Sequence, residues 1–304
     1  MSGLSVFRAH GPGQSDVAEG LLTMLAVAVV CLLAAGYGRG VQELWARRGR
    51  GRVVPGWRVA AFGGGLLVVL AADQGPVHRL AESSFAGHMA QHMLLVLVAG
   101  PLLAAGAAGL PLTLAAPLPP RRLLARWRAA APVRRLRRPA RYALLAGAVQ
   151  TVVLWLWHLP GPYVAAVDRP VLHAAEHLSL VAAAWLLWAP VLGSARHRTP
   201  APVSLLLLVG TMLPASALGA VLTFAPEPVY PARVLGPDPL ADQQLAGLLM
   251  WAPMDLMVLV VALAVFLSWL LRLDRERPDR PVPAWPGRPP TPSPTGGAPE
   301  GVVR

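Results

Sequence analysis

Apolar runs of about 20 residues recur along the chain, and they constrain its fold more than any other feature. About 20 apolar residues in an α-helix cross the hydrocarbon core of a bilayer. Seven segments qualify as spanning helices: 18–37, 57–73, 84–108, 141–159, 170–192, 202–224 and 245–271. Only 14% of the 304 residues are charged, against about 25% in soluble domains. The sequence therefore predicts an all-α, polytopic membrane protein, a bundle of seven transmembrane helices.

The arginines predict how this bundle is oriented. All 27 basic residues are arginines, and 23 of them fall in four alternate connections, around 39–58, 121–141, 196–198 and 272–304. Short connections rich in Arg or Lys stay on the cytoplasmic side of a membrane. We therefore expect the N-terminus outside and the C-terminus in the cytoplasm. This explanation of the +12 charge, and the lack of interleaved aromatic residues, argue against nucleic-acid binding.

The same patterns predict three parts of the chain. Residues 1–17 form an exported N-terminal segment, residues 18–274 the membrane domain, and residues 275–304 a disordered, proline-rich cytoplasmic tail. The arginine-rich stretch 118–141 is typical of an amphipathic segment lying on anionic lipid, although it is equally typical of a plain orienting charge cluster. Cys31 is the only cysteine, which excludes a disulfide framework and any Cys-x-x-Cys metal motif.

Five histidines lie at the predicted outer ends of three spans, and they are the main candidates for a functional site. They are His88 and His92 in the third span, His158 in the fourth, and His173 and His177 in the fifth. Ionisable residues are rare inside membranes and often functional there. His88 and His92 are four residues apart, as are His173 and His177, and this i,i+4 spacing puts both rings of each pair on one helix face. Imidazole binds copper, zinc, iron and nickel, so we expect a metal site, with a hydrogen-bonded helix contact as the alternative.

Other side chains fall near these histidines. Met89 and Met93 offer thioether ligands, which would favour Cu(I), or else simply pack. Glu176 is predicted to support a histidine ligand. Asp242 either does the same or caps its own helix. Asp255 lies deep in the seventh span, where it is either a proton-coupling group or a neutral acid hydrogen-bonded between helices.

Four stretches carry a resemblance to a known family. They are HMAQHMLLVLVAGPLLAAGAAGLPLTLA (88–115), LWLWHLPGPYVAAV (154–167), VLHAAEHLSLVAAAWLLWAPVL (171–192) and DQQLAGLLMWAP (242–253). Over residues 84–272 the chain resembles the CtaG-like integral-membrane family of cytochrome c oxidase assembly factors. The resemblance implies a seven-span protein of the bacterial plasma membrane that is needed to make an active haem-copper oxidase, at the stage of copper insertion. It also implies that the five histidines form the family's histidine set.

The expected function is therefore that of an assembly factor and not an enzyme. Copper would be received at the outer face, held by the histidines and passed to oxidase subunits, with another copper chaperone as a donor. Three alternatives stay open. A membrane redox protein would use the paired histidines as haem ligands, and a metal-dependent hydrolase or oxidase would use Glu176 as a general base. A copper permease would line its path with Asp255 and the methionines of the seventh span, Met250, Met254 and Met257.

Overall fold

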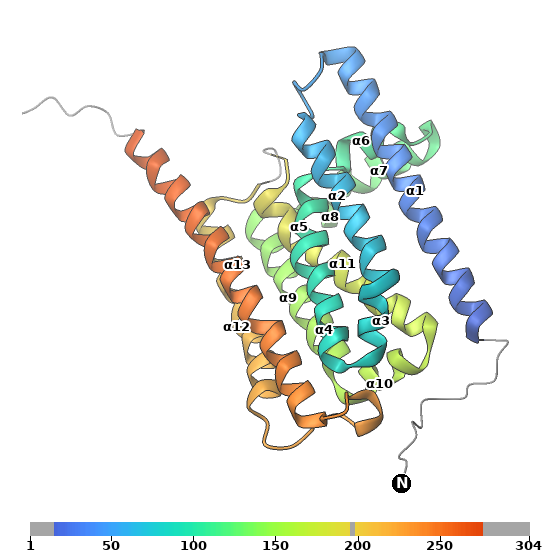
Figure 1. Ribbon diagram of the computed structural model, residues 1–304. Helices are drawn as coiled ribbons and strands as arrows, with labels where there is room; N and C mark the ends of the chain where they lie inside the picture. Colours follow the sequence, from blue (N-terminus) through green and yellow to red (C-terminus); the bar gives the residue numbers. More distant parts are fainter. Residues whose placement is uncertain (1–14, 195–197, 276–304) are drawn as a thin grey trace, which may run out of the picture. The chain divides into compact units, whose positions relative to one another are not determined.

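The computed structural model describes residues 15–194 and 198–275, and all regular secondary structure within them is helical. Seven helical stretches are long and apolar enough to cross a membrane, as predicted (Figure 1). They are α1 (Ser15–Arg48), α2 (Gly56–Asp73), the continuous run Phe85–Ala105, α9 (Pro139–His158), α11 (Pro170–Leu192), α12 (Ala201–Phe224) and α13 (Pro239–Arg275). Backbone contacts divide the chain into two units, residues 1–266 and 267–304. Most of the predicted N-terminal segment and tail lies outside the described residues.

Two helices are longer than the sequence predicts. The first span was expected to end at residue 37, but α1 continues to Arg48. Beyond residue 37 its Val41 and Leu44 are buried, and Arg47 pairs with Glu43 at 2.8 Å, one turn away. Helix α13 likewise covers more than the expected 245–271. Apolar runs measure only the part of a helix that crosses the bilayer, so polar extensions at either end are missed.

Shorter helices fill the connections. Helix α3 (Gly75–Ser83) links α2 to α4 (Phe85–Met93). The connection before α9 contains α6 (Gly109–Ala115), α7 (Leu118–Ala129) and α8 (Ala131–Leu136). Helix α10 (Pro160–Asp168) precedes α11, and the 3₁₀ turn η3 (Ala232–Val234) precedes α13. Helices α7 and α8 occupy the stretch expected to be amphipathic. Leu123 and Trp127 of α7 are more than half exposed, which suits a segment lying on lipid.

Two prolines determine where the histidine-bearing helices end and begin. A residue before proline avoids the helical region of backbone space. Leu159 and Arg169, which precede Pro160 and Pro170, are extended accordingly. Helix α9 therefore ends at His158, and α11 begins at Pro170 on the same side of the bundle. We call this side the histidine end, where α2 and α9 end and α4, α11 and α13 begin (Figure 1).

Helix α11 is the central helix of the first unit, with neighbours that include α1, α5 and α9. It packs tightly against α5 (Gly100–Ala105), where a Cβ on Gly100 would lie only 2.5 Å from the Ala184 Cβ. Only glycine permits this spacing, and small residues are typical of tight helix contacts in membranes. The approach fixes the axis of α11 against the helix run that carries His88 and His92.

A π-helical segment interrupts that run. In η1 (Leu94–Ala99), between α4 and α5, the Gly100 N–H bonds to the carbonyl of Leu95, five residues earlier. Pro101 follows and has no N–H to donate, so regular α-helical bonding cannot continue through this turn. Single π turns inside α-helices occur often at functional sites. Here the turn lies directly after the helix that carries the first histidine pair.

The orientation of the bundle is tested by reporter fusions. A reporter inserted between residues 74 and 84, at the histidine end, is expected to be active only outside the cytoplasm. A reporter after residue 304 should be active only inside it, because the arginine-rich connections stay cytoplasmic. An exported C-terminus would reverse the predicted orientation and put the histidine end in the cytoplasm.

Candidate metal centre

Polar groups hold the start of α4, the helix that carries the first histidine pair. The Ser84 hydroxyl accepts a hydrogen bond from the Gly87 N–H at 3.0 Å, as a helix-capping residue does. The carboxylate of Asp242, in the first turn of α13, accepts from the N–H groups of Phe85 and Ala86 at 2.8 and 3.0 Å. Asp242 thus caps a helix, as one of the two expected alternatives had it, but the helix is α4 and not its own.

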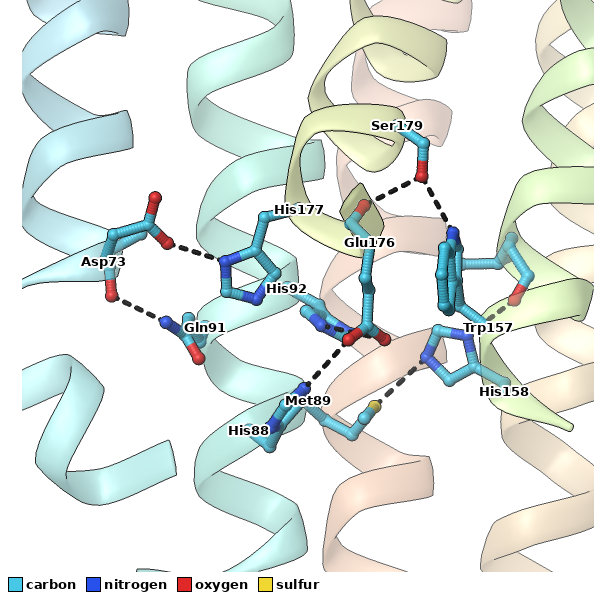
Figure 2. Close-up of polar contacts among 12 residues, drawn as sticks. Asp73, His88, Met89, Gln91, His92, Trp157, His158, Glu176, His177 and Ser179 are labelled. Carbon is cyan, nitrogen blue, oxygen red and sulfur yellow. Dashed lines mark hydrogen bonds and ion pairs between the residues drawn. The ribbon is translucent and has the colours of Figure 1, made fainter. Parts of the chain in front are cut away.

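Four side chains from α4 and α11 converge at the histidine end. They are His88, His92, Glu176 and His177, which we call the buried ligand group (Figure 2). One nitrogen or carboxylate oxygen from each lies within 4.8 Å of those of the others. All four residues are buried, and the Glu176 side chain has no exposed surface at all. Glu176 thus lies beside the histidines as a fourth ligand-type group, not only behind one of them.

Distances within the buried ligand group are too long for direct hydrogen bonds. The Nε2 atoms of His88 and His92 lie 3.7 and 3.5 Å from the two carboxylate oxygens of Glu176. Ligands around a tetrahedral ion with bonds of about 2.0 Å are separated by about 3.3 Å. The spacing is therefore close to that of atoms that share one transition-metal ion.

Unpartnered atoms give the strongest indication of a ligand. His88 Nε2, both ring nitrogens of His92, both carboxylate oxygens of Glu176 and His177 Nε2 are buried without a hydrogen-bond partner among the described residues. Buried polar atoms are nearly always hydrogen-bonded, and leaving one unpartnered costs about 1–3 kcal/mol. Six such atoms in one place fit a cation that would coordinate several of them.

Asp73, the last residue of α2, orients His177. Its carboxylate accepts a hydrogen bond from His177 Nδ1 at 2.6 Å (Figure 2). The proton is therefore on Nδ1, and Nε2 presents its lone pair to the buried ligand group. Metal-binding histidines are usually held this way by a carboxylate or carbonyl. Asp73 is not among the site residues predicted from the sequence, although a carboxylate at the end of the second span is a usable signal.

Removing this carboxylate gives a prediction. Asp73→Ala is expected to weaken the binding of a Cu(II) probe at this candidate centre about 10- to 100-fold, because His177 loses the partner that fixes its tautomer and ring orientation. Asp73→Asn should lose less, since its amide oxygen still accepts from Nδ1. Copper competition with a coloured chelator on purified protein measures both. Equal affinity in wild type and Asp73→Ala would show that His177 does not bind the metal through Nε2.

His158 lies beside the buried ligand group and faces a thioether. Its ring is 5.6 Å from that of His92, and its Nδ1 donates to the Leu154 carbonyl at 2.6 Å. That bond leaves Nε2 unprotonated, 3.1 Å from the sulfur of Met89 (Figure 2). Two acceptors therefore face each other. A ring nitrogen and a thioether sulfur that both have free lone pairs can together act as ligands to one metal ion.

His173 lines a cavity that reaches the buried ligand group from the surface. Its ring centroid lies 4.1 Å from that of His177 and 5.2 Å from that of His88. The cavity measures about 510 Å³, and His88, His177 and Asp73 also line it. His173 is thus positioned on the route between solvent and the buried ligand group, not inside the group.

Two tyrosines pack beside the buried ligand group and His158. The ring of Tyr163, in α10, packs 5.2 Å from that of His88, and the Tyr230 hydroxyl donates to the His158 carbonyl at 2.5 Å. Burial, with the nearby Glu176 carboxylate, raises the pKa of both phenols above the ordinary value of 10. Both hydroxyls therefore stay neutral and add no charge beside the cluster.

Asp255 is held elsewhere. The Ser216 hydroxyl lies 2.7 and 2.8 Å from its two carboxylate oxygens, which joins α12 to α13. Among the described residues, Asp255 is not part of the cavity lining or of the buried ligand group. The contact matches the expected alternative of an acid hydrogen-bonded between helices.

Seven membrane-length helices and a buried cluster of histidines and a carboxylate define a polytopic membrane protein with a candidate transition-metal centre. The sequence profile of the cytochrome c oxidase caa3 assembly factor family matches residues 35–272, and the chain belongs to this family. The match confirms the resemblance seen in 84–272 and extends it toward the N-terminus over residues 35–83. No curated protein and no solved structure matches the chain significantly.

Proposed function

We propose that this protein helps to assemble cytochrome c oxidase by receiving copper at the buried ligand group and releasing it to an oxidase subunit. The family supplies the role in oxidase assembly. The observation that carries the copper step is the set of unpartnered, ligand-type atoms of His88, His92, Glu176 and His177. Copper is cargo in this proposal and not a resident cofactor, and the protein is not an enzyme.

The donor chemistry supports copper as this cargo. Three imidazoles and a carboxylate suit Cu(II), while the adjacent nitrogen–sulfur pair of His158 and Met89 suits Cu(I). The two sets of ligands are neighbours, because the ring of His92 in the first set lies 5.6 Å from the ring of His158 in the second. The cavity reaches His88 and His177 from the surface, which gives ligands from solution a route to bound copper, so copper can leave by ligand exchange.

The surroundings of the site in the cell are part of the proposal. We place the protein in the bacterial plasma membrane with the histidine end outside, where it would meet oxidase subunits and a copper-donating chaperone. The exposed arginines and apolar residues of α7 and α8 would rest on anionic lipid at the opposite, cytoplasmic face. Haem binding is not part of this proposal, because the Glu176 carboxylate faces the Nε2 atoms of His88 and His92 at 3.7 and 3.5 Å, the atoms that would bind a haem iron.

A deletion strain tests the function. We expect its oxidase subunits to be present in the membrane but copper-deficient and inactive, with total cell copper nearly unchanged. Wild-type protein should restore oxidase copper, and His92→Ala should not, because it removes a ligand at the centre of the group. Glu43→Gln, in the Arg47 pair remote from the site, is the control and should restore it fully.

Two results would contradict the proposal. One is a normal copper content in the oxidase of the deletion strain. The other is rescue only by raised cytoplasmic copper, which would indicate transport across the membrane. Purified protein is also expected to show no Soret band, since a stoichiometric haem would instead favour a redox role.

A further inference from the structure

A second group of ligand-type side chains lies at the mouth of the cavity. It consists of Glu19 from α1 and of His78 and Glu82 from α3, and we call it the mouth group. Its ligand-type atoms all lie within 4.8 Å of one another, as in the buried ligand group. The Nε2 of His78 is 3.5 Å from the Glu19 carboxylate and 3.6 Å from that of Glu82. His78 and Glu82 share the i,i+4 spacing of the two histidine pairs.

The mouth group is open to solvent. The side chains of Glu19 and Glu82 are 53% and 61% exposed, and that of His78 is 26% exposed. The Nδ1 of His78 is nevertheless buried and has no hydrogen-bond partner in the described part of the chain. Two exposed carboxylates beside one imidazole attract cations from solution and exchange them readily.

The cavity joins the mouth group to the buried ligand group. Glu19, His78 and Glu82 line it together with His88 and His177, whose side chains are only 5% and 6% exposed. The unpartnered Nε2 atoms of those two histidines are an independent sign that this cavity receives a cation. Both groups therefore belong to one water-accessible space.

His173 bridges the two groups. Its ring is 6.3 Å from that of His78 on one side, and 5.2 and 4.1 Å from those of His88 and His177 on the other. Imidazoles thus follow one another from the mouth to the interior. An ion leaving the mouth group meets a new nitrogen ligand before it reaches the buried ligand group.

We propose that the mouth group is a second metal site, which captures a divalent transition-metal ion and passes it through His173 to the buried ligand group. Metal–ligand bonds to Glu19, His78 and Glu82 break as bonds to His173, and then to His88 and His177, form. The ion keeps its charge, so no electron donor or acceptor is needed. Two oxygens and one nitrogen at an exposed site bind less tightly than three nitrogens and one oxygen at a buried site. The gradient in affinity therefore points inward.

The identity of the natural cargo rests on the proposed function, but the mouth group as a metal site does not. The test uses purified full-length protein and Cu(II) as the probe. Wild type is expected to bind two Cu(II) ions with separable affinities, seen as two sets of signals by electron paramagnetic resonance. His78→Ala and the double variant Glu19→Gln/Glu82→Gln should lose the weaker site and keep the tighter one.

Loading kinetics give the second measurement. Stopped-flow quenching of tryptophan fluorescence follows the filling of the buried ligand group. The double variant should load at least about tenfold more slowly with unchanged final occupancy, because charged side chains at a cleft raise capture rates 10- to 1,000-fold. Glu43→Gln, which removes the other described glutamate of α1, partly buried and away from the cavity lining, is the control and should load at the wild-type rate.

The His92→Ala variant separates this proposal from the proposed function. If His92→Ala still binds one weak Cu(II) that His78→Ala abolishes, the mouth site stands whether or not the buried group handles copper. If His78→Ala changes neither the number of bound ions nor the loading rate, the mouth site is overturned, even where His92→Ala confirms the buried one.

Discussion

Glu176→Gln is expected to weaken copper binding at the buried ligand group by at least about 100-fold while leaving the metal-free protein as stable as wild type or more so. Removing one charged partner from a buried ion pair costs about 3–5 kcal/mol, and here that partner is the ion's only anionic ligand in the group. Without metal, Glu176 lowers the stability of the folded protein, because the wild-type carboxylate is buried with both oxygens unpartnered among the described residues. A neutral amide of the same shape removes the cost of burying a charge there.

Chelator competition and thermal unfolding in detergent measure the two effects on the same samples. Glu43→Gln is the control for the loss of one carboxylate and should change neither property. A Glu176→Gln protein that binds copper normally would show that the carboxylate is not a ligand. One that unfolds well below wild type would show that Glu176 has a structural role that its contacts do not reveal.

Asp242→Ala is expected to lower the free energy of unfolding by about 2–3 kcal/mol. Its carboxylate accepts from three backbone N–H groups, those of Phe85, Ala86 and Gly236, and hydrogen bonds to charged groups contribute about 1.5–3 kcal/mol each, although not additively. The first turn of α4 would fray, and copper affinity should fall with it because the histidines follow one turn later.

Asp238→Ala is the matched control, since the Asp238 carboxylate accepts from the Ala241 N–H, three residues along its own segment, at an exposed position. We expect it to cost about 1 kcal/mol, with no change in copper affinity. Chemical unfolding in mixed detergent gives the free energies. If both alanine variants lose the same stability, the start of α4 does not depend on α13.

Much of the fold could be predicted from the sequence, because crossing a bilayer imposes a length and a composition that a single chain displays directly. The fifth span, 170–192, coincides with α11 because prolines and glycine mark its ends. The first span was predicted too short, since the second part of α1 is held by packing and by the Glu43–Arg47 pair. Apolar content does not register either of these.

The candidate site could be predicted only in part. Helical spacing put His88 with His92, and His173 with His177, on shared faces. The structure brings the two faces together, with ring contacts from one pair to the other. Spacing cannot say how two helices are rotated against each other, so it did not show that Glu176 would lie among the histidines. The partner of His177 is Asp73, 104 residues away in the chain, and no local pattern connects them.

The π-helical turn η1 has a consequence for how this site can be adjusted. One additional residue in a helical turn rotates everything beyond it by about 100°, since an α-helix has 3.6 residues per turn. The half with Gly100 can therefore keep its tight seat against Ala184 while the half with His88 and His92 faces a different direction. An unbroken α-helix could not combine the packing of Gly100 against Ala184 with the present direction of His88 and His92. Deleting one residue from η1 should thus leave α5 packed against α11 and turn both imidazoles away from Glu176. Mutations in this one transmembrane segment can therefore change the direction of the histidine side chains without changing how the segment packs.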